Sequence, residues 1–463
     1  MKKVVKKTKN HLMELMENQA IKIVVNSSDK NLIREIGIMQ KLTSILGGTK
    51  KGKEEFDYFK KLVEAKHPVK RWIKRINDEL NPHCRNLLFN NIFLKTLYWK
   101  KKKNKFAKRE GFEGPTNIVV SPTMKCNLRC EGCWAGKFQK VPDLEMSLLE
   151  RIVEEVREMG VNFVTITGGE PFIRKDLFNL YEKFPDVYFQ IYTNGTLISE
   201  EVAKKLGKIG NAAMMISVEG GEEKTDSRRG KGVYRKGITA MNNLKKEGVP
   251  FGFSVVATRY NVEEITSDEF IDDLIEKGCL NGWYFQYIPI GRNPDTSLML
   301  TPEQRDYMRK RVYKIRNTKP IFLADFWNDG PLMNGCMAGG KSYLHINPLG
   351  DIEPCAFAQF AIDNIRNKTI TEALRSPFFK AIREGIPYDG NLLRPCMVVD
   401  RPEILRDHVK RFGAHPTYPG GDCLFSSPIK DELDKYAKGV KKIYDKAWQE
   451  GDWITLFTTD YLE

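Results

Sequence analysis

From residue 117 onward, short apolar segments alternate with amphipathic ones, and this pattern constrains the fold more than any other feature of the chain. Strands are predicted at 117–121, 163–167, 187–192, 212–218, 251–257 and 283–288. Helices are predicted between them, for example over 148–159, 234–247 and 267–277. Strands that alternate with helices form a parallel sheet or barrel. Six units are too few to close an eight-stranded barrel, so we predict an α/β fold with a partial, laterally open (β/α)6 barrel.

Polar and glycine-rich residues follow several of these strands directly. The relevant segments are Gly168-Gly169-Glu170-Pro171, Thr193-Asn194-Gly195, and Ser217 with Glu219. Binding sites of parallel barrels collect at the carboxyl ends of their strands. We therefore expect a ligand site at this edge, although ordinary strand-to-helix turns would also use such glycines.

Three cysteines, Cys126, Cys130 and Cys133, form a C-x3-C-x2-C run directly after the first predicted strand. Three thiolates on one loop can hold three irons of a cubane cluster and leave the fourth iron open to a ligand. A structural zinc knot is the alternative, but it normally needs four ligands in paired spacing. Because no further cysteine or histidine follows within about 30 residues, the spacing favours the cluster.

Composition indicates a globular protein of about three domains. The chain has 463 residues, of which 41% are hydrophobic and 29% charged. Nine cysteines without a recognisable secretory signal favour a reducing, cytoplasmic setting and metal ligation over disulfides. No run of 18 or more apolar residues occurs, so a membrane-spanning helix is not expected.

The basic excess lies in the N-terminal quarter. Residues 1–110 contain 28 Lys and Arg against 11 Asp and Glu, a net charge of +17, whereas residues 111–463 contain 47 against 49. This region is predicted to be helical, with an apolar stripe over 69–80 and an aromatic segment over 87–99 that runs into Lys100-Lys101-Lys102-Lys103. Such a segment suits peripheral contact with an anionic membrane on its inner face. The alternative is that the stripes pack on the core and the lysines are solvated; nucleic-acid binding is less expected because no known module is present.

The cysteine run, GGEP, TNG and the strand end at Ser217 together resemble the radical S-adenosylmethionine (SAM) superfamily, over residues of about 115 to 295. The resemblance implies a [4Fe–4S] cluster on Cys126, Cys130 and Cys133 that binds and reductively cleaves SAM to a 5′-deoxyadenosyl radical. The cofactor-binding residues that it implies are Gly168, Gly169, Glu170, Pro171, Asn194, Ser217, Glu219 and Arg229. Many members carry an aromatic residue just before the third cysteine. Here that position is Gly132, with Trp134 after the cysteine.

A second group of cysteines follows the predicted barrel. Cys336 and Cys355 flank Gly350 in a C-x13-G-x4-C run, and Cys396 and Cys423 follow singly. The run resembles the opening of SPASM or Twitch domains, which implies one auxiliary [4Fe–4S] cluster held by these four thiolates. Buried reduced cysteines are the alternative, and this is the simplest interpretation of Cys84 and Cys279.

The expected domains are a basic helical region (1–112), the partial barrel (113–320), the auxiliary-cluster domain (321–430) and a C-terminal helical segment (431–463).

Substrate and partners follow less directly. We expect hydrogen abstraction from an unactivated C–H bond of a lipid hydrocarbon chain, since no strand-rich peptide-binding wing is recognised in the N-terminal region. A peptide- or protein-modifying maturase is the alternative, and a plain iron–sulfur electron carrier is a third hypothesis. A reductant such as ferredoxin or flavodoxin and an anaerobic setting are expected. Asp325 and Asp329 are candidate proton acceptors, although roles as helix caps or turn residues are the favoured explanation.

Overall fold

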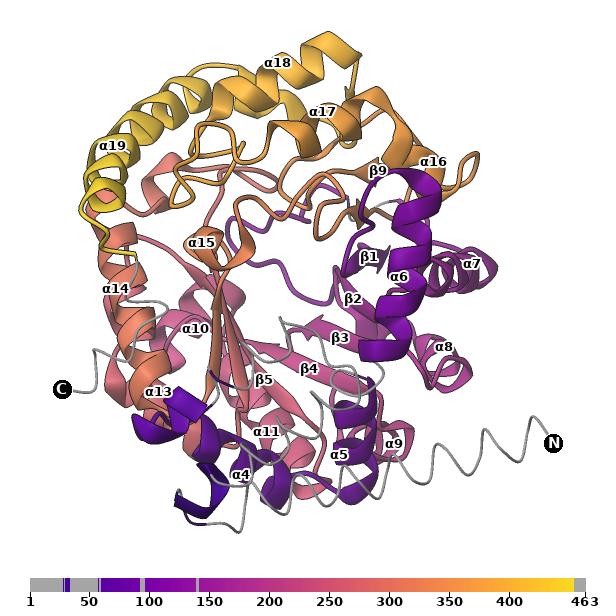
Figure 1. The fold of residues 1–463 in the computed structure, drawn as a ribbon, viewed down its shortest axis with the longest axis vertical. Coiled ribbons are helices and arrows are strands. Elements are labelled where there is room, and N and C mark those ends of the chain that lie inside the picture. The colour runs from indigo at the N-terminus through magenta and orange to yellow at the C-terminus, as the bar shows by residue number, and fades with distance from the viewer. Residues whose placement is uncertain are drawn as a thin grey trace.

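One open sheet organises the chain in the computed structural model (Figure 1). The structure describes residues 28, 30–33, 57, 60–91, 96–138 and 141–453. The strands run in the order β7-β6-β5-β4-β3-β2-β1-β8-β9, and this order does not close on itself within the described residues. The first seven are parallel to one another: β1 (Ile118–Thr123), β2 (Phe163–Gly168), β3 (Tyr188–Thr193), β4 (Ala212–Ser217), β5 (Phe251–Ala257), β6 (Asn281–Gln286) and β7 (Phe322–Asp325).

These strands are largely buried on both faces, which explains why they appear in the sequence as apolar runs and not as alternating ones. In β4, for example, Met214, Met215 and Ile216 are all fully buried. The helices of the barrel units cover the outer face, and they put their apolar sides into the same core. The predicted α/β fold, with an open sheet, a helical N-terminal region and a C-terminal domain, is confirmed.

Helices connect the strands and cover the sheet. Those before β7 are α4 (Val69–Glu79), α5 (Pro82–Phe89), α6 (Thr96–Glu110), α7 (Met146–Glu158), α8 (Leu177–Lys183), α9 (Glu200–Ile209), α10 (Glu222–Arg229), α11 (Val233–Lys246), α12 (Val262–Ile265), α13 (Asp268–Glu276) and α14 (Pro302–Thr318). Those after it are α15 (Gly330–Met333), α16 (Ile370–Arg375), α17 (Pro377–Gly385), α18 (Pro402–Phe412) and α19 (Ile429–Gln449). Short 3-10 turns are η2 (Pro171–Ile173), η3 (Thr296–Leu298) and η4 (Gly421–Phe425).

The sheet extends beyond the six predicted strands at both ends. At one edge β7 pairs with β6, with Asn281 opposite Phe322. At the other edge β8 (His345–Ile346) pairs in parallel with β1, and β9 (Ile352–Glu353) pairs antiparallel with β8. The short strands β10 (Phe360–Ala361) and β11 (His415–Pro416) form a separate pair. The sheet therefore includes strands from the region that we assigned to the auxiliary domain, and the domain boundaries themselves stay predictions.

The N-terminal helices pack against the body of the protein. On α4, the Trp72 indole N–H donates to the Leu280 carbonyl at 2.7 Å, and Arg75 donates to the carbonyl of Cys279 at 2.9 Å. On α6, Phe106 is 2% exposed whereas Lys100 and Lys105 face solvent. The aromatic face of α6 is thus used in core packing, as the simpler of the two interpretations expects. Membrane contact stays a prediction, and none of the helices described is long and apolar enough to cross a bilayer.

Helix α19 closes the C-terminal half against α14 (Figure 1). Arg305 on α14 is fully buried and forms an ion pair with Asp400, and its Nε donates to Asn328 Oδ1 at 3.1 Å. The Tyr444 hydroxyl on α19 donates to the same Asn328 oxygen at 2.9 Å. A buried charge is tolerated only when it is paired and hydrogen-bonded, and this arrangement satisfies both conditions.

Candidate functional site

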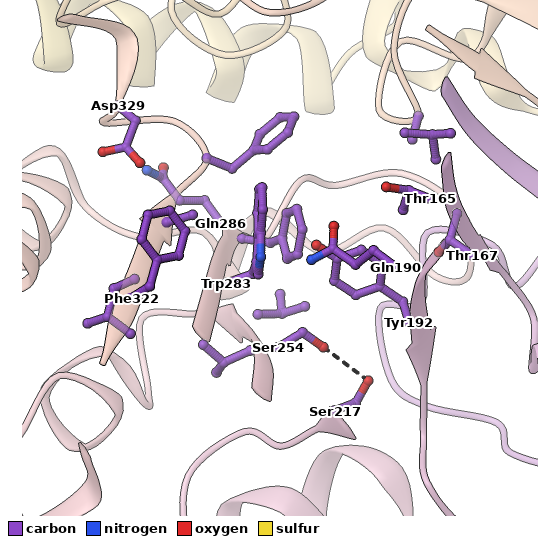
Figure 2. Close-up of a pocket in the computed structure, with 18 of the residues that line it drawn as sticks. Thr165, Thr167, Gln190, Tyr192, Ser217, Ser254, Trp283, Gln286, Phe322 and Asp329 are labelled. Carbon is purple, nitrogen blue, oxygen red and sulfur yellow. Dashed lines mark hydrogen bonds between the residues drawn. The ribbon is translucent and has the colours of Figure 1, made fainter. Parts of the chain in front are cut away.

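A cavity of about 840 Å³ occupies the inside of the open barrel. Figure 2 shows side chains from β2 to β6 that point into it, among them Gln190, Tyr192, Ser254 and Trp283. The cavity reaches from the cysteine loop after β1 to Trp72 on α4. Most of its lining is aromatic or aliphatic, with a few polar groups, which is typical of sites for organic substrates.

The loop between β1 and α7 brings Cys126, Cys130 and Cys133 together at one end of this cavity. Burial, together with the charges of Glu170, Cys130 and Cys133, raises the pKa of Cys126 to about 11. Burial and Cys130 likewise raise the pKa of Cys133. We refer to these three residues as the first cysteine site. Desolvated thiols that would repel one another as anions fit a site whose thiolates are neutralised by bound iron.

Backbone N–H groups point at the sulfurs of several cysteines. The N–H of Leu128 donates to Cys126 Sγ at 3.4 Å, and that of Ala135 bonds to Cys133, in each case two residues further along the chain. Hydrogen bonds to ligating sulfurs stabilise the thiolate form and set the reduction potential of iron–sulfur clusters. The backbone of the loop by itself therefore provides hydrogen bonds that stabilise the thiolate form of these cysteines.

The glycines of the GGEP segment allow β2 to approach the cysteine loop. A Cβ on Gly168, whose φ is +118°, would lie 2.3 Å from the Thr123 carbonyl oxygen, and one on Gly169 would lie 2.2 Å from that of Lys125. The Gly169 N–H donates to Thr123 O at 2.9 Å. Both glycines line the cavity, but glycine is required at these two positions because the neighbouring backbone leaves no room for a Cβ.

Glu170 connects the ends of β2 and β3. Its carboxylate accepts hydrogen bonds from Phe172 N at 3.0 Å, Thr193 Oγ1 at 2.7 Å and Asn194 N at 2.8 Å. The residue is fully buried, and this burial raises its pKa. Glu170 is outside the cavity lining, as is Pro171, so the structure shows both in supporting positions.

Asn194, Ser217 and Arg229 line the cavity, as a cofactor-binding role expects. The Asn194 amide N–H donates to Asn127 Oδ1 at 2.9 Å and lies 4.0 Å from Cys126 Sγ. Ser217 Oγ lies 3.4 Å from Ser254 Oγ (Figure 2). Asn194 and Ser217 lie at the carboxyl ends of the adjacent strands β3 and β4, and Arg229 is the last residue of α10.

Glu219 is buried behind two cavity-lining arginines. It forms ion pairs with Arg228 at 2.6 Å and with Arg229 at 2.5 Å. Burial opposes the charge of Arg229, but Glu219 keeps the pKa of this guanidinium above its usual value. Arg228 was not among the predicted site residues. The charges of Arg228 and Arg292 lower the pKa of Cys133, so the first cysteine site has a cationic rim.

Gly132 has its own structural explanation. A Cβ at this position would lie 2.5 Å from the ring of Tyr287, and its φ of +57° is also unfavourable for other residues. The Tyr287 ring, just after β6, therefore occupies the place beside the cysteine loop that a side chain at 132 would take. Trp134 packs edge-on against His345, with ring centroids 5.7 Å apart.

Three of the four later cysteines come together, and we call them the second cysteine site. Cys336, Cys355 and Cys396 line one void of about 30 Å³. Burial raises the pKa of Cys336 to about 12, and the pKa of Cys396 is raised by burial, by Asp400 and by the other two thiols. Phe357 N donates to Cys355 Sγ at 3.4 Å and Val398 N to Cys396 Sγ at 3.3 Å, again from two residues along the chain.

Cys423 is placed elsewhere. Its sulfur donates to the Pro289 carbonyl at 3.8 Å and interacts with Tyr418, and it is not among the residues that line the void. It also lacks the N–H contact from two residues along the chain in the described hydrogen bonds. The structure therefore does not bring Cys423 to the three cysteines with which the sequence grouped it. Spacing alone could not reveal this, because the segment between Cys396 and Cys423 folds as α18 and turns away.

Neither cysteine site converges on a single metal ion, and no group of three His, Cys, Asp or Glu side chains in the described residues does so. A cubane presents separate irons to separate thiolates, so its ligands do not need to meet at one point. The two triplets, their N–H contacts and the void at the second site fit iron–sulfur clusters.

The two sites border the same cavity. Phe326, Asp329, Met333, Met337, Tyr343 and Phe357 line both the cavity and the void of the second site. Of the two aspartates suggested by sequence, Asp329 reaches the cavity, whereas Asp325 is fully buried outside its lining. Tyr343 contacts Cys355, with its hydroxyl 2.7 Å from the sulfur.

A thiol triplet at the carboxyl edge of an open parallel barrel, with a second triplet across the cavity, defines an iron–sulfur enzyme. Residues 120–271 match the Radical SAM superfamily, and residues 336–403 match SPASM, an iron–sulfur cluster-binding domain. The two matched segments identify a radical SAM domain and a SPASM-type iron–sulfur domain in this chain. Its cofactors are therefore a SAM-binding [4Fe–4S] cluster, an auxiliary [4Fe–4S] cluster and S-adenosylmethionine.

Curated relatives match about half to three fifths of the chain. The mycofactocin maturase MftC of Mycolicibacterium smegmatis is 32% identical over 262 residues, which are 54% of this chain and 66% of that protein. The PqqA peptide cyclase of Gluconobacter oxydans is 25% identical over 305 residues, 62% of this chain and 84% of that protein. The chain thus spans just under two thirds of the length of the first of these relatives.

Among solved structures, Streptococcus suis SuiB bound to S-adenosylmethionine has a similar fold. The TM-score is 0.53 with 20% identity, over 74% of this chain and 87% of SuiB. At this identity the likeness concerns the fold alone. It supports the arrangement of an open barrel with an attached C-terminal domain.

Proposed function

We propose that this protein is a peptide-modifying radical SAM enzyme. The observation that carries the proposal is the single cavity that contacts all three cysteines of the first site and borders the second. A substrate in this cavity would lie within reach of both cofactor sites. The names of two relatives, a maturase and a peptide cyclase, support a peptide as the substrate class.

Bound SAM and its cluster would supply a 5′-deoxyadenosyl radical that abstracts hydrogen from an unactivated C–H bond of the substrate. The protein's part is to bind, orient and exclude water. Arg228, Arg229 and Arg292 form a cationic rim suited to the carboxylate of SAM and to thiolate ligands. Aromatic walls such as Trp283 and Phe285, stacked with centroids 6.2 Å apart, keep water away from the reacting carbon.

Modification of a lipid hydrocarbon chain is the second candidate. The aromatic and aliphatic lining of the cavity, from Phe285 to Phe357, favours it, because an acyl or isoprenoid chain would bury well there. The named relatives support the peptide instead, and we therefore rank the lipid second.

The test is formation of 5′-deoxyadenosine by the anaerobically reduced holoenzyme with SAM. One arm receives a soluble peptide fraction and the other a membrane lipid extract. Stimulation by peptides alone supports the proposal, and stimulation by lipid alone overturns it in favour of the second candidate. The Cys126→Ala variant is the control and should form no 5′-deoxyadenosine in either arm.

A further inference from the structure

Two polar groups on one wall of the cavity have unused hydrogen-bonding capacity. Asp329, which is 8% exposed, directs one carboxylate oxygen to the protein: Oδ2 accepts from Arg316 Nη2 at 2.7 Å and from Asp325 N at 2.8 Å. Its other oxygen, Oδ1, is buried and has no hydrogen-bond partner in the described part of the chain. A buried acceptor in this condition destabilises the folded protein unless something satisfies it.

Gln286 is the matching donor. It is 4% exposed, and its Oε1 accepts a hydrogen bond from the Tyr436 hydroxyl at 3.4 Å. This contact directs the carbonyl side of the amide toward α19. The Nε2 atom on the other side is buried and has no partner among the described residues.

The two groups belong to the same end of two neighbouring strands. Tyr284 pairs with Asp325 in the β6–β7 ladder, so Gln286 and Asp329 lie two and four residues beyond one register position. Both line the cavity, and Figure 2 shows them on the same wall. The two residues that carry the unsatisfied donor and the unsatisfied acceptor therefore both line one substrate space.

We propose that Gln286 and Asp329 form a recognition site for the backbone of one residue of the substrate peptide. The C=O of this residue would accept from Gln286 Nε2, and its N–H would donate to Asp329 Oδ1. The inference rests on the proposed peptide substrate and specifies which part of it is read.

Charge and polarity favour a peptide backbone over other groups. Arg316 neutralises Asp329, so the wall carries no net charge that would select an ion. A carboxylate could not donate to Asp329 and would be repelled by it, and a hydrocarbon would leave both atoms unsatisfied. One trans amide points its C=O and N–H in opposite directions, but the N–H and C=O of one residue in an extended chain point to the same side and can satisfy both groups.

The test measures binding, so that it is independent of turnover. The probe is an equimolar library of N-acetylated, C-amidated tripeptides, retained by holoenzyme with SAM in equilibrium dialysis and quantified by mass spectrometry. In two further libraries the amide before the middle residue is changed to an ester, which removes the N–H of that residue, or the amide after it is changed to a thioamide, which weakens its C=O as an acceptor. The wild-type protein should retain the amide library about tenfold more strongly than either analogue, a difference of about 1.4 kcal/mol.

Each variant should lose sensitivity to one analogue only. Asp329→Asn should no longer discriminate against the ester, whereas Gln286→Leu should no longer discriminate against the thioamide. Asp407→Asn, on an exposed position of α18, is the matched control and should discriminate like the wild type. Thermal unfolding checks the fold of each variant. If Asp329→Asn does not fold, Gln286→Leu still decides the matter because it leaves the Arg316–Asp329 pair in place.

The outcomes separate this inference from the proposed function. Equal retention of amide, ester and thioamide by the wild type would overturn the recognition site, even where peptides stimulate 5′-deoxyadenosine formation. Retention of none of the libraries, together with stimulation by lipid alone, would overturn both.

Discussion

At the scale of single residues, the hydrogen bonds on sulfur separate the cysteines by role. Cys126, Cys133, Cys336, Cys355 and Cys396 each receive a backbone N–H from the residue two positions further on. Cys84 and Cys279 are buried in apolar surroundings, as the sequence predicts for packing residues. Cys423 belongs to neither group. Among the described hydrogen bonds Cys130 of the first site lacks this contact, and Cys423 receives backbone N–H groups only from Leu424 and from its own residue. The contact from two residues further on therefore accompanies five of the six cysteines in the two cysteine sites.

This distinction predicts the iron content of two variants. Cys396→Ala should lower iron from about eight to about four atoms per chain, because it removes one of three thiolates at the second site. Cys423→Ala should keep about eight. Iron and acid-labile sulfide assays on anaerobically reconstituted protein measure both. Equal losses in the two variants would restore Cys423 to the ligand set.

Asp325 gives a pH dependence whose sign can be worked out. Burial, with the neighbouring Asp329, raises its pKa to about 6. The folded state therefore holds the proton at pH values where the unfolded state has lost it, so this residue lowers stability as pH rises toward 6. Asp325→Asn should gain stability relative to the wild type by about 1 kcal/mol between pH 5 and 7.5. Anaerobic urea unfolding at both pH values checks this, and a pH-independent difference would contradict it.

At the scale of elements, α4 supports the cavity from the amino-terminal side of the sheet. Trp72 lines the cavity, and Arg75 on the same helix donates to the carbonyls of Cys279, Pro320 and Ile275. Cys279 and Pro320 lie just before β6 and β7, and Ile275 lies in α13, which precedes β6. Arg75 therefore makes three of the hydrogen bonds that fix α4 to the barrel, beside those of Trp72 and Arg71.

Replacement of the Arg75 side chain should loosen the helix. Arg75→Met should destabilise the protein by about 2 kcal/mol and increase amide hydrogen exchange over 69–79, because it removes three hydrogen bonds to backbone. Lys74→Met is the matched control: Lys74 is exposed and pairs only with Asp78, so its loss should change stability by less than about 0.5 kcal/mol. Unchanged exchange in Arg75→Met would show that the other contacts of α4 hold it in place.

The elements also show what sequence could and could not predict. The six central strands were predictable because each is a run of six or seven mostly apolar residues that are buried or half-buried. Strand β7 has only four residues, its Phe322 is 51% exposed, and it has no periodic pattern of its own. Strands β8 and β9 have two residues each, and they are defined by their hydrogen bonds to the neighbouring strands. Such elements are decided by pairing, which a single sequence does not display.

The same limit applies to the site. The first cysteine site and most cavity-lining strand ends follow from local motifs. Gln286 and Tyr287 enter the cavity from the end of β6, Arg228 from α10 and Trp72 from α4, and no motif connects them. The glycines of GGEP were expected to bind the cofactor, but the neighbours that require glycine there are the backbone carbonyls of Thr123 and Lys125.

At the scale of the whole molecule, the barrel and the auxiliary domain share a sheet. β1, which leads into the first cysteine site, pairs directly with β8, and Cys355 follows β9 by two residues. His345 on β8 adds a buried side-chain contact, with Nε2 2.8 Å from Ser121 Oγ on β1. The two cysteine sites are thus connected through backbone pairing and not only through a domain interface.

That shared ladder fixes the distance between the two cysteine sites. Because strand spacing is set by hydrogen-bond length, insertions in the long segment between β1 and β8 leave the separation of the two sites unchanged. Evolution of this scaffold toward a larger or smaller substrate would therefore act through the side chains that fill the gap, while the gap itself stays constant.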